Sequence, residues 1–195
     1  MNDIVNVKTY TDIPIDKSQI LRYAQCFEPN KQVENLVSKC LEEINLTYKV
    51  CYRKFAIKHA RNSLDLSFCT TESKALQKLL ENCDSIVLFA ATVGIDIDRL
   101  IIKNSKTDPA KALIFQAIGT ERVEGLCDVF EADLKREFGY SLTPRFSPGY
   151  SDVSLEMQAD VFKALDCFKN IGITLNDSLL MTPTKSVTAI LGVQR

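Results

Sequence analysis

The segment RFSPGY at residues 145–150 places an arginine, a turn and a tyrosine within a short stretch of chain. Pro148-Gly149 is a turn signal, because proline presets its own φ and glycine tolerates the positive φ of a tight turn. A turn requires neither Arg145 before it nor Tyr150 after it. A guanidinium can donate paired hydrogen bonds to an anion, and a phenol supplies an aromatic wall with a polar tip. The segment is therefore a candidate ligand-binding loop.

The same two side chains also have a structural interpretation. Arg145 could cap the carbonyl groups at the end of the preceding helix, where a cation is favoured by the helix dipole. Tyr150 could be a packed aromatic residue whose hydroxyl group stays in water. From the loop alone, both interpretations remain open.

Two glutamates on the preceding helix are further candidates. The pattern predicts that helix over residues 109–138, with one stripe of mostly apolar side chains facing the core. Glu124 and Glu131 share the bearing of this stripe at about 100° per residue. A carboxylate on an apolar face is costly unless it is paired or faces a pocket. Either glutamate could line a pocket, and both could instead pair with a cation from another element. The stripe itself comprises Leu113, Ala117, Thr120, Cys127, Leu134 and Phe138.

Several other kinds of chemistry are not supported. The chain has one histidine, His59, in the basic segment KHARNS, with no nucleophile or acid partner nearby in the sequence. Its seven cysteines are dispersed and form no CxxC pair, so we expect no metal site. The glycines form neither a GxGxxG motif nor a P-loop, which argues against a nucleotide-phosphate site of those types.

Composition narrows the class of protein. A hydrophobic content of 46% with 25% charged residues is typical of a globular domain. The net charge of −1 provides no basic field for nucleic acid. The N-terminal segment MNDIVNVKTYTD lacks the pattern of a signal peptide, and no apolar run approaches the ~18 residues of a membrane helix. We therefore expect a cytoplasmic protein with reduced thiols, no nucleic-acid partner and no membrane partner.

The elements of the N-terminal part are predicted from capping residues and periodicity. Asp16 and Gln19 suggest a capping box for a short helix, and apolar residues at helical spacing predict a second helix over 31–46. Alternation then predicts strands over 48–57 and 64–68, which we expect to pair with each other.

The elements that position the candidate residues follow. We predict a helix over 71–82, a buried central strand over 85–94 and a helix over 95–105. Asp108 should cap the long helix that starts at Pro109, and Gly139 should end it. An amphipathic helix is expected over 155–170, capped near Gly172, and a hairpin or meander over 173–193. The mixed order of helices and strands indicates an α+β fold.

Three segments of the chain resemble a known family. They are AIGTERVEGLCDVFEADLKREFGY, then RFSPGY, then NIGITLNDSLLMTPTKSVTAILG. Together they strongly resemble the activation domain of cobalamin-dependent methionine synthase, most densely over residues 110–192 and more weakly through FAATVGIDIDRLI. The resemblance implies one domain over 1–195, with N-terminal helices and a strand pair in 1–70 and the core in 71–195. It also implies mixed helices and a twisted, largely antiparallel sheet.

What the resemblance implies for function is reductive reactivation. In that family the domain binds S-adenosylmethionine (AdoMet). Inert cob(II)alamin receives one electron from a flavodoxin-type donor and a methyl group from AdoMet, which restores methylcobalamin. The implied AdoMet contacts comprise the glutamate of the long helix and residues of the loop, with Ser147 contributing backbone groups: Glu124, Arg145, Ser147, Gly149 and Tyr150. The resemblance thus selects Glu124 over Glu131.

The chain carries no DxHxxG motif for cobalamin. We therefore expect an accessory subunit that reaches cobalamin only through a cobalamin-binding methionine synthase on a separate chain, with a flavodoxin-like electron donor. Such a subunit would not turn over alone. The alternative is a non-catalytic docking or AdoMet-sensing module for a corrinoid protein or another corrinoid methyltransferase.

Overall fold

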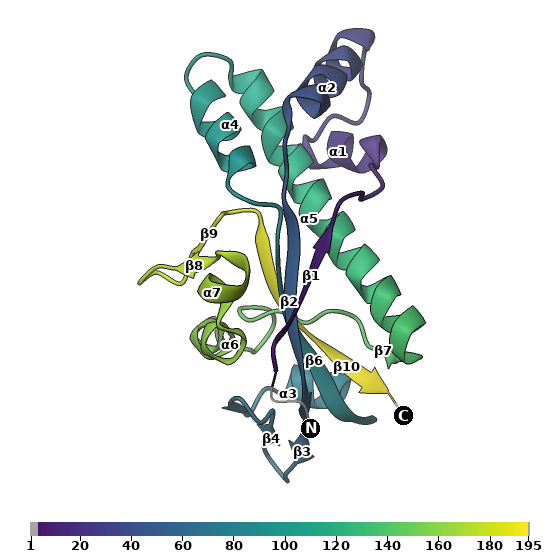
Figure 1. The fold of residues 1–195 in the computed structure, drawn as a ribbon, viewed down its shortest axis with the longest axis vertical. Coiled ribbons are helices and arrows are strands. Elements are labelled where there is room, and N and C mark those ends of the chain that lie inside the picture. The colour runs from purple at the N-terminus through teal and green to yellow at the C-terminus, as the bar shows by residue number, and fades with distance from the viewer. Residues whose placement is uncertain (1–3, 195) are drawn as a thin grey trace.

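A five-stranded antiparallel sheet runs along the long axis of the molecule (Figure 1). The structure is a computed structural model that describes residues 4–194. The strand order is β1-β2-β6-β10-β7. The strands span Asn6–Tyr10 (β1), Tyr48–Ala56 (β2), Cys83–Thr92 (β6), Ser141–Leu142 (β7) and Ser186–Gln194 (β10).

The central strand β6 is buried on both faces, as its continuous apolar sequence predicts. Because successive side chains point to opposite faces of a strand, β6 contributes to two cores. Phe89 and Ala91 face the core that includes the long helix α5. Leu88 and Ala90 face the core that includes α6 and α7.

Seven helices surround this sheet within the described residues. The long helix α5 begins and ends where the sequence predicts. Asp108 Oδ1 accepts a hydrogen bond from Lys111 N at 3.0 Å, and Gly139 ends the helix with φ = 64°. The helices are Lys17–Tyr23 (α1), Lys31–Glu43 (α2), Lys74–Leu79 (α3), Asp96–Asn104 (α4), Pro109–Phe138 (α5), Met157–Leu165 (α6) and Cys167–Ile171 (α7). None of the helices between residues 4 and 194 is long and apolar enough to cross a membrane.

Two small sheets complete the fold. One consists of β3 (Lys58–His59), β4 (Leu64–Asp65) and β5 (Thr70–Thr71), and the other of β8 (Thr174–Leu175) and β9 (Met181–Thr182). The predicted pairing of strands 48–57 and 64–68 is wrong. β2 pairs with β1 and β6, whereas β4 pairs with β3 and β5. β2 is long enough to bridge two partners in the main sheet, and alternation within one strand does not identify its partners.

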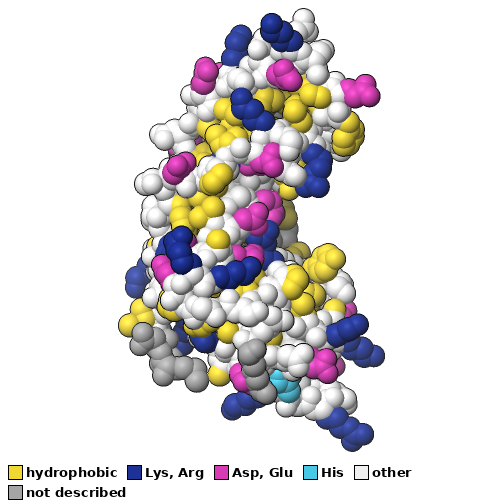
Figure 2. Space-filling view, turned by 90° about the vertical axis from the view of Figure 1, so that its right-hand side faces the viewer, with side chains coloured by type: hydrophobic (Ala, Val, Ile, Leu, Met, Phe, Trp, Pro, Cys, Tyr) yellow, Lys and Arg dark blue, Asp and Glu magenta, His cyan; other side chains and the backbone are white. Residues whose placement is uncertain are grey.

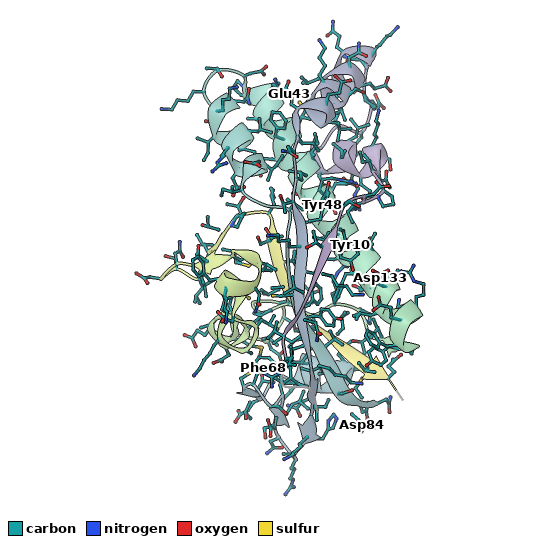
Figure 3. The ribbon with its side chains drawn as sticks, in the orientation of Figure 1. Tyr10, Glu43, Tyr48, Phe68, Asp84 and Asp133 are labelled. Carbon is teal, nitrogen blue, oxygen red and sulfur yellow. The ribbon has the colours of Figure 1, made fainter. Side chains whose placement is uncertain are left out.

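The N-terminal strand β1 was not predicted, because polar residues dominate it. It is an edge strand, antiparallel to β2, and one end is attached to α5. The hydroxyl group of Tyr10 donates to Asp133 Oδ2 at 2.9 Å, and Figure 3 shows the two residues on neighbouring elements. Burial, followed by this hydrogen bond, raises the pKa of Tyr10 well above its ordinary value, so the phenol stays protonated.

Two predictions about the C-terminal part are corrected. The helix expected over 155–170 is two helices, α6 and α7, because Asp166 adopts a left-handed conformation with φ = 45°. The tail does form a hairpin, β8–β9, but its last segment is β10, which inserts between β6 and β7 of the main sheet.

The predicted buried stripe on α5 is wrong at both ends. Leu113 is 51% exposed and Phe138 is 49% exposed. The core contacts of α5 come instead from a set that includes Phe115, Ile118 and Phe130. The physical reason is that α5 carries apolar residues around most of its circumference, so one bearing does not define the core side.

Candidate functional site

Arg145 gathers three carboxylates from one side of α5. Its Nη1 donates to Asp128 Oδ1 at 2.9 Å and to Glu131 Oε1 at 2.8 Å. Its Nη2 donates to Glu124 Oε2 at 3.1 Å. The three acidic residues share one face because they are spaced by four and three positions on the helix. Both sequence candidates, Glu124 and Glu131, therefore pair with the same arginine.

The three carboxylates differ in exposure. The side chain of Asp128 is 71% exposed and that of Glu124 is 41% exposed, whereas that of Glu131 is 18% exposed. Burial raises the pKa of Glu131 above its ordinary value, against the opposing attraction of Arg145. Glu131 is thus the interior anchor for Arg145, and the other two carboxylates can exchange partners with solvent or a ligand. One guanidinium among three carboxylates leaves an excess of negative charge that favours a cationic group.

A pocket of about 480 Å³ adjoins this cluster. It lies between α5 and the segment that leads into α1, and Glu124, Asp128 and Arg145 are among the residues that line it. Figure 2 shows acidic and basic side chains gathered midway along the long axis, beside a hollow in the outline of the molecule. The volume is within the usual range for small-molecule sites, about 300–1,000 Å³.

A buried ion pair on α5 positions the other wall of the pocket. Arg122 is 1% exposed and donates from Nε to Glu121 Oε2 at 2.5 Å. Its Nη1 and Nη2 donate to the carbonyl oxygens of Ile13 and Pro14 at 2.7 and 2.5 Å. Glu121 Oε1 accepts from Asp16 N at 2.9 Å. These bonds attach the segment before α1 to α5.

Sequence reasoning missed this pair, because the inspected bearing of α5 excluded both residues. The signal that could have found it is the adjacent Glu121-Arg122 within a mostly apolar helix. The pair also explains why only half of the predicted capping box forms. Asp16 Oδ1 accepts from Ser18 N and Gln19 N, but Asp16 N donates to Glu121 and not back to Gln19.

The RFSPGY loop is attached to the open side of β10. Phe146 and Ile190 exchange two backbone hydrogen bonds, of 3.0 and 2.9 Å. The predicted turn is confirmed: Tyr150 N donates to Ser147 O at 3.2 Å, and Gly149 has φ = 81°. Tyr150 is 68% exposed, and its ring meets the ring of Phe146 edge-on at 5.5 Å. The arginine and the tyrosine are thus presented by a loop fixed to the sheet.

A second pocket, of about 450 Å³, lies along the edge of β10 and is lined in part by Ser147, Leu180 and Thr188. On this side of β10, the pairing within residues 4–194 is confined to Phe146 at Ile190 and to β7 at the C-terminal end. Backbone groups alternate between the two edges of a strand. Those of Ser186 and Thr188 therefore point to the same open edge as those of Ile190. This edge can donate to and accept from a ligand.

The structure thus brings Glu124 and Arg145 into direct contact at the first pocket, and it places Ser147 at the second. Gly149 and Tyr150 lie in the turn that follows. No group of three or more His, Cys, Asp or Glu side chains within residues 4–194 is arranged to hold a metal ion.

Comparison with known proteins gives two findings. Residues 74–194 match the family described as vitamin B12 dependent methionine synthase, activation domain. The solved structure titled "Crystal Structure of the MetH Reactivation Domain bound to AdoHcy" shares the fold with a TM-score of 0.69 and 16% identity, covering 97% of this chain and 78% of that chain. No curated protein matches the sequence. The predicted family resemblance and the predicted α+β class are both confirmed.

Proposed function

The chain belongs to the family of the vitamin B12 dependent methionine synthase activation domain, and from this premise we propose that it binds AdoMet beside α5 and supports reductive methylation of cobalamin on a partner chain. The observation that carries the proposal is the contact of Arg145 with Glu124, at a pocket adjoining a fixed loop and an open strand edge. The bound S-adenosylhomocysteine (AdoHcy) named for the similar structure supports it.

The two ends of AdoMet suit the two pockets. The methionine end carries a carboxylate, an ammonium and a sulfonium. Glu124 accepts from the ammonium, and the acidic excess around Arg145 favours the sulfonium. Arg145 donates to the ligand carboxylate once the exposed Asp128 side chain moves aside.

The adenosine end lies toward the second pocket. The open edge of β10 at Ser186 and Thr188 supplies a donor and acceptor pattern for the adenine ring. The backbone of Ser147 adds further groups, and Gly149 permits close approach because it has no side chain. The exposed ring of Tyr150 provides an aromatic wall. In this proposal the five predicted residues act from one side of the ligand.

The chemistry itself belongs to the partner. One electron from a flavodoxin-like donor reduces cob(II)alamin to cob(I)alamin, and cob(I)alamin then takes the methyl group of AdoMet, which yields methylcobalamin and AdoHcy. This chain binds and orients AdoMet, so we propose an accessory subunit that does not turn over alone. We also propose a single domain over 1–195, supported by the shared core that joins Ile13, Ile20 and Cys40 to α5 and β10.

The proposal is tested by mixing the protein with a methionine synthase truncated before its own activation domain, in the cob(II)alamin state. AdoMet and reduced flavodoxin are added, and conversion to methylcobalamin is followed by visible absorbance. We expect conversion that depends on this protein. Equal conversion without the protein would contradict the proposed role. AdoMet binding without any conversion would favour the alternative sensing or docking module.

A further inference from the structure

Lys185, immediately before β10, is half-buried and held in one position. Its carbonyl oxygen accepts from Val93 N at 3.2 Å, which attaches the residue to the end of β6. Its side chain crosses α5 at Gly119, where an added Cβ would lie 2.8 Å from Lys185 Cγ. Its Nζ donates to Thr120 Oγ1 at 3.0 Å. The absence of a side chain at Gly119 therefore makes the path that brings this ammonium onto α5.

This ammonium has no carboxylate within ion-pair distance among residues 4–194. Burial lowers the pKa of Lys185, and the charge of Asp98 opposes this effect. Asp98 itself accepts from Thr184 N at 2.8 Å and from Thr184 Oγ1 at 2.6 Å. A partly desolvated cation without a counter-ion is unfavourable. An anionic group of a ligand would offset that cost.

The position of Lys185 relates it to the proposed AdoMet site. Thr120, its hydrogen-bond partner, precedes Glu124 by one turn of α5, about 5.4 Å along the axis. Arg145 contacts Glu124 as well, but two further carboxylates already surround its guanidinium. Lys185 is therefore a cation beside Glu124 that lacks a carboxylate partner.

We propose that Lys185 binds the carboxylate of AdoMet while Glu124 accepts from its ammonium. An amino-acid group carries both charges on one carbon, so it matches a cation and a carboxylate held about one helical turn apart. The inference rests on the proposed AdoMet-binding function. It also gives Arg145 a second task, which is to position Glu124.

The test compares two ligands that differ only in the carboxylate. AdoMet and decarboxylated AdoMet are titrated by calorimetry into the wild-type protein, Lys185→Met and Lys39→Met. Lys39 is an exposed lysine on α2, so the control makes the same change in net charge away from Thr120 and Glu124. Melting temperatures report whether each variant remains folded, and Lys185→Gln replaces Lys185→Met if the latter does not fold.

We expect Lys185→Met to weaken AdoMet binding by about tenfold or more, the size expected for a charge-assisted pair. Its affinity for decarboxylated AdoMet should stay within about twofold of wild type, because that ligand lacks the group in question. Lys39→Met should change neither affinity. Equal weakening of both ligands, or of neither, would overturn the assignment of Lys185. A wild-type protein that binds neither ligand would instead overturn the proposed function.

Discussion

Arg145 does two tasks in this account, because it neutralises three carboxylates and also faces a pocket. In the ligand-free structure its described hydrogen bonds go to side chains of α5. The sequence suggested that it might cap carbonyl groups at the end of that helix, but Gly139 ends the helix through its own backbone. Removing Arg145 therefore leaves Glu124, Asp128 and Glu131 close together without their shared cation.

For Arg145→Ala we expect weaker AdoMet binding and a lower melting temperature. Affinity should fall about tenfold or more, because one charge-assisted contact is lost and the remaining carboxylates repel the carboxylate of AdoMet. Arg145→Lys should recover part of the affinity, since an ammonium does not reproduce the planar fork. Calorimetry and thermal unfolding measure the two effects separately. A lower melting temperature with unchanged affinity would assign the loop a purely structural role.

Glu131 predicts a pH dependence with a defined sign. Burial raises the pKa of Glu131 in the folded protein, so the folded state binds this proton more readily than the unfolded state. Its contribution to stability therefore improves as the pH falls from above the raised pKa to the ordinary glutamate pKa, and it declines as the pH rises. Glu131→Gln removes this dependence. Urea unfolding of both proteins across that pH window should show the wild type gaining on the variant as the pH falls, and a constant difference would contradict the assignment.

At the scale of elements, the loop after Tyr150 is held by a helix N-terminus. Asp152 Oδ2 accepts from Lys74 N at 2.7 Å at the start of α3, and Asp152 Oδ1 accepts from the hydroxyl group of Ser73. Ser73 in turn caps α3 by accepting from Leu76 N at 3.0 Å. The conformation of the proposed ligand loop thus depends on an element far away in the sequence.

We expect Asp152→Ala to lower the melting temperature and to weaken AdoMet binding by loosening the turn at Gly149. The hydrogen bond from Ser73 is the first cause that holds the pKa of Asp152 below its ordinary value of 3.8. A lowered pKa stabilises the folded state above the unfolded pKa, and this contribution is lost as the pH falls through the folded pKa. The difference in stability between wild type and variant should therefore be constant at neutral pH and shrink below pH 3.8. A variant with wild-type melting temperature at neutral pH would show that Asp152 does not hold the loop.

The sequence predicts elements best where local signals agree. The bounds of α5 follow from Asp108, Pro109 and Gly139, and β6 follows from a continuous apolar run. Strand partners depend on contacts far apart in the chain, so the pairing of β2 was predicted wrongly. The break at Asp166 was missed, because a left-handed aspartate within an amphipathic pattern leaves no periodic signal.

The candidate site was predicted only in part for the same reason. The motif resemblance named Glu124 and Arg145, and the structure places them in contact. Their grouping with Asp128 and Glu131 depends on where the loop crosses α5, which local patterns do not encode. The role of Glu121 and Arg122 likewise depends on the path of the chain before α1.

At the scale of the whole molecule, one sheet separates two cores, and thiols occur in both. Cys40 and Cys127 lie in the core beside α5, whereas Cys51, Cys83 and Cys167 lie in the core on the other face. Burial raises the pKa of Cys40 to about 11. Such thiols are largely protonated at neutral pH and react slowly with thiol reagents.

All seven cysteines are free in the structure. We therefore expect all seven to react with a thiol reagent after denaturation under non-reducing conditions, with only a minority reacting rapidly in the native protein. Mass spectrometry of the unreduced protein provides the control. Detection of two or more native disulfides would contradict both the structure and the expectation of a reducing compartment.

The central claim concerns AdoMet, and its most direct test is calorimetric titration of the purified wild-type protein with AdoMet in the absence of added metal. The account predicts saturable binding, with detectable binding of AdoHcy as well, and weaker AdoMet binding by Arg145→Ala measured under the same conditions. No heat of binding at about millimolar AdoMet, where even a dissociation constant near 1 mM would be detected, would contradict it.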